Sequence, residues 1–153
     1  LRPWLSFNTL CHEFIHVIDY NKKPVRFLLG YMFPQNLAVF SIFALLAFVS
    51  PWFLFFLIAL GFLTPIPSPF RRDTEIRGYQ MSYLLDKEQG VIEPGLSALV
   101  NHYANQFVNS SYYFMSRDSN YTKSRILEVD NLKDQYPYKE VLDISLKYQV
   151  KGE

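Results

Sequence analysis

The sequence predicts an all-α protein in which a single domain, residues 1–153, carries a hydrophobic helical hairpin between two more polar helices. Three observations support this prediction. Residues 5–20 alternate polar and apolar side chains at the helical step of about 100°. Residues 27–70 contain no charged side chain and are interrupted by Ser50-Pro51, which favours a turn between two apolar helices. The rest of the chain shows helix caps and helical periodicity, with no internal repeat and no glycine-rich phosphate loop.

The helix expected over residues 5–20 divides into a polar half and an apolar half. The polar half carries Asn8, Thr9, His12, Glu13, His16, Asp19 and Tyr20. The apolar half carries Phe7, Leu10, Cys11, Phe14, Ile15, Val17 and Ile18. An ordinary amphipathic helix would turn its polar half toward water, and this alternative stays open on the sequence alone.

The polar half contains His12-Glu13-Phe14-Ile15-His16, in which two imidazoles four residues apart share one helical face with a carboxylate beside the first. This spacing is typical of half of a zinc hydrolase site, in which the glutamate acts as the general base. Asp19 lies on the same face and is expected to accept a hydrogen bond from an imidazole, although a solvated helix end is an alternative for this residue.

A catalytic zinc site uses three protein ligands and keeps one position for water, so a third donor is needed. The best candidate is Glu75, on a helix expected to be capped by Asp73 or Thr74. Gly78 follows Glu75 along the same helical stripe and is small enough for close packing against the histidine helix. Asp73 is a reserve ligand and His102 a weaker one, because an isolated histidine is more often a surface or core residue.

Tyr79 and Tyr83 follow Glu75 on the same predicted helix. A phenol from either residue is a candidate donor to the oxyanion that forms during amide hydrolysis, with Tyr79 preferred. Plain packing is the alternative in a chain with 11 tyrosines.

These residues resemble the gluzincin metallopeptidases, which combine His-Glu-x-x-His on one helix with a glutamate ligand on a later helix. The resemblance covers Leu10 to about Leu85 and is greatest to the membrane-embedded branch with the CAAX prenyl proteases and heat-shock membrane proteases. Small phage-encoded metallopeptidases are a second possible kinship. The membrane proteases have an acidic residue four positions after the ligand glutamate, where this chain has Tyr79. The resemblance implies His12, His16 and Glu75 as ligands of Zn²⁺ and Glu13 as general base.

The hydrophobic segment, residues 27–70, has its densest parts at 37–49 and 52–63. As α-helices these arms would each be roughly 20 Å long, shorter than a bilayer core of about 30 Å. A single crossing would separate His12 from Glu75, so a hairpin that leaves and returns on one side is expected. Basic residues flank both ends, which predicts that both ends are cytoplasmic. The alternative is a hairpin buried in a larger assembly such as a virion.

The C-terminal segment, residues 117–153, holds seven basic and seven acidic residues and is expected to be solvated and helical over 123–134 and 138–148. A further helix is expected from Pro94-Gly95 to about Met115, and a loop over 117–121. The balanced charges and the net charge of +1 argue against a nucleic-acid partner. The lone Cys11 is expected to be an inert buried thiol.

Together, the residues and the resemblance lead us to expect a zinc-dependent, membrane-associated metallopeptidase that hydrolyses a peptide or protein substrate at the cytoplasmic face. Its other expected partner is membrane lipid or a hydrophobic partner subunit. The alternative is a non-enzymatic membrane-inserting or structural subunit of an assembly such as a phage virion, with a structural or degenerate metal site.

Overall fold

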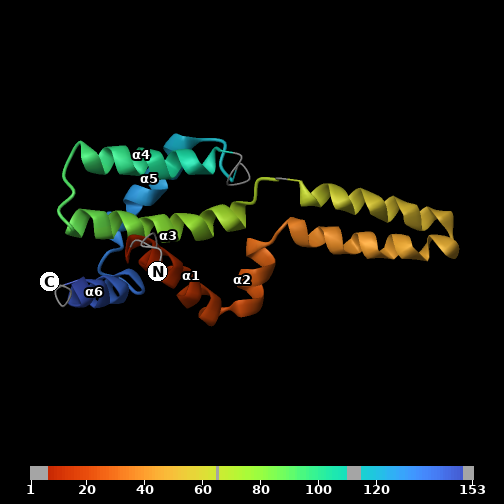
Figure 1. Cartoon of the computed structure of the whole chain (residues 1–153), viewed down its shortest axis with the longest axis horizontal. Helices are drawn as coiled ribbons and strands as arrows, with labels where there is room; N and C mark the ends of the chain where they lie inside the picture. The colour runs from red at the N-terminus through yellow and green to blue at the C-terminus, as the bar shows by residue number, and fades with distance from the viewer. Residues whose placement is uncertain (1–6, 65, 110–114, 150–153) are drawn as a thin grey trace, which may run out of the picture.

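The computed structural model describes residues 7–64, 66–109 and 115–149, and over these residues the chain forms only helices and loops (Figure 1). The all-α prediction is confirmed. The helices form a body from which a long hairpin projects to one side (Figure 1). The sequence excursion between the two polar helices is therefore also an excursion in space.

Helix α3 (Pro69–Glu88) is the centre of the body and packs against α1 (Phe7–Lys22) along its length. It begins earlier than predicted. Ser68 is its N-cap, with the Ser68 hydroxyl accepting a hydrogen bond from the Arg71 amide at 3.4 Å, and Pro69 occupies the first helical position. The prediction of a cap at Asp73 or Thr74 was wrong, since both residues lie inside the helix.

Three more helices and one short 3₁₀ turn enclose α3: α4 (Gly95–Phe107), α5 (Ser119–Leu127), η4 (Glu128–Asn131) and α6 (Tyr138–Gln149). Helix α4 ends before the predicted Met115, and residues 110–114 lie outside the described residues. The core around α3 includes Ile15, Ile76, Met81, Leu84, Leu85, Val100, Phe107, Ile126 and Val129.

The C-terminal segment differs from the prediction of a solvated tail. Ile126 and Val129 are fully buried, and Tyr138 and Val141 are nearly so, because α5, η4 and α6 pack against the body. The predicted loop over 117–121 is also partly wrong. Asp118 caps α5, its carboxylate accepting a hydrogen bond from the Asn120 amide at 2.8 Å.

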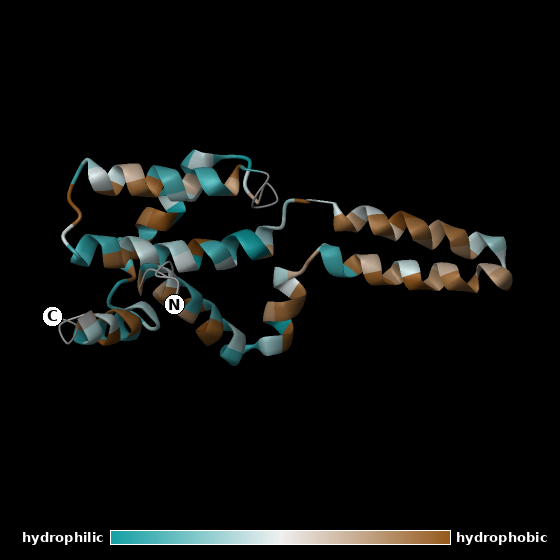
Figure 2. Ribbon diagram, in the orientation of Figure 1, coloured by the Kyte–Doolittle hydropathy of each residue, from teal (hydrophilic) through white to brown (hydrophobic). Residues whose placement is uncertain are grey.

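The hairpin consists of η1 (Gln35–Phe48) and η2 (Pro51–Leu63), two 3₁₀ helices that turn at Val49-Ser50. At about 2.0 Å per residue, arms of 14 and 13 residues are about 28 Å and 26 Å long, which exceeds the predicted 20 Å. The arms pack against each other, with the rings of Phe43 and Phe56 5.3 Å apart. Both arms are mainly apolar (Figure 2), and Phe48 and Trp52 at the turn are 85% and 73% exposed.

Helix α2 (Pro24–Tyr31) connects α1 to the hairpin. Among the described residues no single helix is both long and apolar enough to cross a membrane, whereas α2 and η1, bent by 81° at a short break, meet that criterion only as a pair. At the base of the hairpin, the end of α2 packs against the start of α3. A Cβ on Gly30 would lie 3.5 Å from the Cβ of Phe70, so the chain leaves and re-enters the body at one place.

Candidate metal centre

Helix α1 does not follow the usual rule for a surface helix, because its histidine face points inward. His12 is 8% exposed and His16 is half-buried, whereas Leu10 and Phe14 on the predicted apolar half are 54% and 46% exposed. The buried face of α1 lies across the boundary of the two predicted halves, because Cys11 and Ile15 of the apolar half are buried beside His12. This face packs on α3, so the two histidines do not simply face water as the amphipathic alternative would have them.

Gly78 is the reason that α1 and α3 approach so closely at this point. A Cβ at position 78 would lie 2.5 Å from both Cε1 and Nε2 of His12, far inside van der Waals contact. Only glycine leaves room for the His12 ring to lie across α3. Glu75 is one helical turn before Gly78, so the same approach brings its carboxylate to the imidazoles.

Three side-chain atoms converge between the two helices. His12 Nε2 and His16 Nε2 are 3.2 Å apart, and Glu75 Oε2 lies 3.5 Å from the first and 3.8 Å from the second. A point equidistant from all three atoms is about 2.0 Å from each, which matches Zn–N and Zn–O bond lengths. The residues therefore fit a divalent cation held by two imidazoles and one carboxylate. That they bind zinc stays a prediction.

The charge state of Glu75 suits this role. Burial would raise the pKa of the carboxyl group, but hydrogen bonds with His12, His16 and the Tyr31 hydroxyl outweigh burial and hold the pKa well below its usual range. Glu75 is only 5% exposed. A buried carboxylate that stays ionised is a suitable metal ligand.

Tyr31 is the site residue that sequence reasoning missed. Its hydroxyl donates a 2.5 Å hydrogen bond to Glu75 Oε1, the carboxylate oxygen that does not face the imidazoles. The Arg71 guanidinium lies 4.8 Å from the centre of the Tyr31 ring and helps to fix it. A hydrogen bond to the outer oxygen of a ligating carboxylate orients that ligand. Tyr31 lies in the charge-free stretch 27–70, and nothing in the sequence marks it as a partner of Glu75.

Tyr79 contacts the site through its ring. It lies edge-on to His12 with centroids 4.8 Å apart, and it packs on Tyr103 at 4.9 Å. The Tyr103 hydroxyl donates to Asp86 at 2.8 Å, and Asn8 donates to the other oxygen of Asp86 at 2.7 Å. This network supports His12 from behind. The proposed role of the Tyr79 phenol as an oxyanion donor stays a prediction.

Tyr83, the alternative to Tyr79, donates its hydroxyl to Asp130 at 3.0 Å and so is engaged away from the ligand cluster. Glu13 follows His12 directly and its side chain is exposed. Its role as general base stays a prediction.

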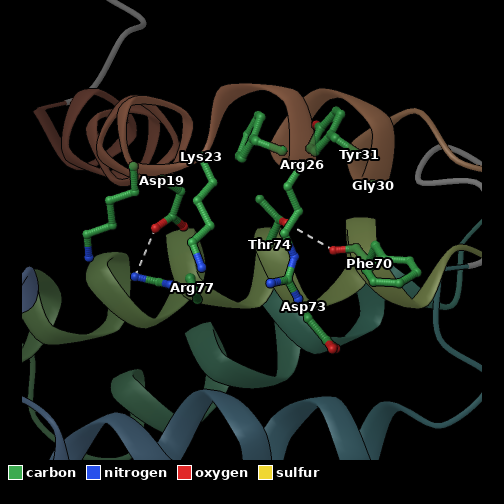
Figure 3. Close-up of a pocket in the computed structure, with 11 residues that line it drawn as sticks. Asp19, Lys23, Arg26, Gly30, Tyr31, Phe70, Asp73, Thr74 and Arg77 are labelled. Carbon is green, nitrogen blue, oxygen red and sulfur yellow. Dashed lines mark hydrogen bonds and ion pairs between the residues drawn. The ribbon is translucent and has the colours of Figure 1, made fainter.

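The predicted role of Asp19 as an acceptor for an imidazole was wrong. The Asp19 carboxylate pairs with Arg77 at 3.0 Å (Figure 3), and His16 Nδ1 is buried without a hydrogen-bond partner among the described residues. Arg77 lies on α3, two residues after Glu75, and its guanidinium contacts the Asp19 carboxylate on α1. The pair joins α1 to α3 and does not orient the imidazole.

The reserve ligands do not belong to the cluster. Asp73 pairs with Arg72 at 2.9 Å, and His102 is an exposed residue of α4 whose Nε2 lies 3.4 Å from the Gln106 amide. Cys11 is buried as expected, its thiol 3.1 Å from the Ser145 hydroxyl. Glu75 is thus the one predicted third ligand that meets both histidines in the described part of the chain.

Comparisons of the chain with protein-family models, with curated proteins and with solved structures find no match.

Proposed function

We propose that this chain is a zinc-dependent metallopeptidase that hydrolyses peptide bonds. The observation that carries the proposal is the convergence of His12, His16 and Glu75 on one point about 2.0 Å from each donor atom, the length of a zinc–ligand bond. The exposed Glu13 supplies the second element that such a site needs, a base that is not itself a ligand.

A zinc ion held by these side chains would lower the pKa of bound water toward about 7 and polarise the scissile carbonyl. Glu13 accepts a proton from the attacking water as the new C–O bond forms. When the C–N bond breaks, Glu13 returns that proton to the leaving amine. Atoms and charge balance, since one water and one amide give one acid and one amine.

The remaining side chains hold the metal ligands in position. Tyr31 holds Glu75 through the outer carboxylate oxygen, and Tyr79 holds the His12 ring from the side. Tyr79 is also the proposed donor to the oxyanion, if its phenol reaches the substrate carbonyl.

The chain is further proposed to be membrane-associated, with the site on the cytoplasmic side. The hairpin arms are mainly apolar and expose many large apolar side chains, a pattern that fits burial in lipid. Lys22, Lys23 and Arg26 precede the hairpin and Arg71 and Arg72 follow it, so cations lie at both ends.

Metal content tests the ligand set. Purified wild type is expected to contain zinc at one ion per chain, and His12→Ala and Glu75→Ala are expected to lose it. His102→Ala is the matched control, because His102 is exposed and lies outside the cluster. Unchanged zinc in the two ligand variants ends the proposal.

Activity tests the chemistry separately. Glu13→Gln is expected to keep zinc. It is expected to lower the rate of hydrolysis of casein, or of the chain itself, by about 10²-fold to 10⁴-fold. Glu140→Gln on the exposed face of α6 is the matched control and is expected to retain activity. Hydrolysis that survives in the Glu13 variant would assign the activity to another group or to a contaminant.

A second candidate function rests on the projecting hairpin alone. A non-enzymatic subunit could use the hairpin to insert into a membrane or to pack inside a larger assembly, such as a phage particle, with the metal site structural. Alkaline carbonate extraction separates these locations, because an inserted hairpin stays with the membrane pellet and a packed subunit is released. Stoichiometric zinc without any Glu13-dependent hydrolysis would favour this candidate.

A further inference from the structure

A basic cleft of about 400 Å³ lies between the α1–α2 junction and α3, beside the metal centre. Its cationic lining residues are Lys22, Lys23, Arg26 and Arg77, and Tyr31 also lines it. In Figure 3 the side chains of Lys23 and Arg26 extend from the α2 side toward α3, into the space between the helices.

The carboxylates that line the cleft do not neutralise these two cations. Asp19 pairs with Arg77 at 3.0 Å, and Asp73 pairs with Arg72 at 2.9 Å. Within residues 7–64, 66–109 and 115–149, neither Lys23 nor Arg26 forms an ion pair. The cleft therefore presents two uncompensated positive charges to a ligand. Lysine and arginine together form strong charge-assisted hydrogen bonds to phosphate oxygens.

An apolar groove of about 950 Å³ continues from the cleft along the start of the hairpin. The cleft and the groove share Arg26, Gly30 and Phe70. Apart from Asn36 and the shared Arg26, the groove is lined by apolar residues of α2, η1 and their connection: Val25, Leu29, Phe33, Leu37, Val39 and Phe40. Val25 is 69% exposed and Leu29 57% exposed, so the groove is open to an apolar ligand.

We propose that cleft and groove together bind one anionic phospholipid. Its phosphate lies on Lys23 and Arg26, and one acyl chain follows the groove beside η1. A free phosphate would use the cleft and leave the groove empty, whereas a phospholipid matches both surfaces in charge and in polarity. Gly30 and Phe70, which meet at the base of the hairpin, both line the cleft, so it lies at the level at which lipid headgroups meet a hairpin inserted in a bilayer. This inference rests on the proposed membrane association but does not depend on zinc chemistry.

Native mass spectrometry of the full chain in mild detergent tests the site. The chain is mixed with anionic and zwitterionic phospholipids that carry identical acyl chains. Wild type is expected to retain one anionic lipid per chain in preference to the zwitterionic lipid. Lys23→Gln with Arg26→Gln is expected to weaken that retention roughly 30-fold, since each cation near an anionic lipid contributes about fivefold.

The matched control is Arg117→Gln with Lys139→Gln, which removes the same two side-chain types at exposed positions outside the cleft. The control is expected to retain lipid like wild type, and circular dichroism checks that both double variants are folded. Equal retention of the two lipids by wild type, or full retention by the Lys23 and Arg26 variant, overturns the proposal.

Two competitors separate other anionic ligands from a lipid. Glycerol phosphate is expected to displace the lipid only weakly, and displacement at equal concentration would assign the cleft to a free phosphate instead. An acidic peptide is likewise expected to compete weakly, and strong competition that needs Lys23 and Arg26 would make the cleft a peptide subsite. Glu13→Gln must retain lipid whether or not the chain is a peptidase, so failure here and failure of the proposed function are distinguishable.

Discussion

The close approach of α1 and α3 at Gly78 provides the sharpest test of the metal centre. In Gly78→Ala the new Cβ would start 2.5 Å from Cε1 and Nε2 of His12. Non-bonded carbon atoms pack at about 3.5 Å, so the ring must retreat by about 1 Å or the helices must separate by a similar distance. The Nε2 atom that has to move is the one that lies 3.2 Å from His16 and 3.5 Å from Glu75.

Two effects oppose each other in the stability of this variant. Alanine is better than glycine inside a helix by about 1 kcal/mol, whereas overpacking a tight contact costs about 1–3 kcal/mol. The net destabilisation is thus expected to be small, up to about 2 kcal/mol. Metal binding is more sensitive, because ligand distances must hold to about 0.2 Å. A ligand displaced by about 1 Å should lower zinc affinity by roughly 100-fold, at the upper end of what orienting residues alone provide.

Zinc affinity is measured by competition with a chromophoric chelator, and stability by thermal unfolding with and without zinc. Gly61→Ala is the matched control, because no atom lies within 4 Å of a Cβ at that position. The control is expected to bind zinc like wild type and to be equally or more stable. If Gly78→Ala bound zinc as tightly as wild type, the reasoning that His12 and α3 share one metal centre would be refuted.

Three other substitutions test the surroundings of the site. Tyr31→Phe removes the hydrogen bond to Glu75 and should lower zinc affinity about 10-fold to 100-fold in the same titration without unfolding the chain; an unchanged affinity would contradict its positioning role. Asp19→Asn breaks the pair with Arg77, so thermal unfolding should show a loss of about 1 kcal/mol or less with zinc affinity unaltered. Burial raises the pKa of Asp86 despite its hydrogen bonds from Tyr103 and Asn8, so its contribution to stability is full below the unfolded pKa of about 3.9 and is lost as pH rises through the folded value. Urea unfolding across this acidic range should show a flatter pH dependence for Asp86→Asn, and an unchanged slope would show that another group is responsible.

Local periodicity and helix chemistry predicted the helices and the hairpin better than they predicted the individual contacts of the site. The histidine helix, the Glu75 helix and a hairpin turning near Ser50-Pro51 were all expected from the sequence, and the small size of Gly78 correctly predicted close helix packing. The start of α3 was missed although a signal was present. Ser68 followed by Pro69 is a typical N-cap and first helical residue, and this pair favours an earlier start than Asp73.

Contacts between remote residues could not be read in the same way. Tyr31 is 44 residues from Glu75 and lies in a charge-free stretch that suggested only membrane contact, so nothing marked its hydroxyl as a partner of a carboxylate. Asp19 and Arg77 show the converse problem. Both line the cleft between α1 and α3, but their pairing depends on the register between these helices, which the close packing at Gly78 constrains.

The inward histidine face of α1 has an energetic cost that bears on function. Burying two imidazoles and a carboxylate is unfavourable unless each polar atom finds a partner, and the exposed Leu10 and Phe14 forgo burial on the opposite side. Cys11 and Ile15 are buried beside the histidines, so the buried face of α1 takes in part of its polar half and leaves part of its apolar half in solvent. Such a conflict between local pattern and observed packing is typical of functional sites. A cation bound by the three side chains would offset this cost, because binding to the folded state alone adds its free energy to that of folding. Metal binding would therefore explain why α1 buries its histidines. Without a metal, nothing in the described part of the chain offsets the cost of burying these polar groups.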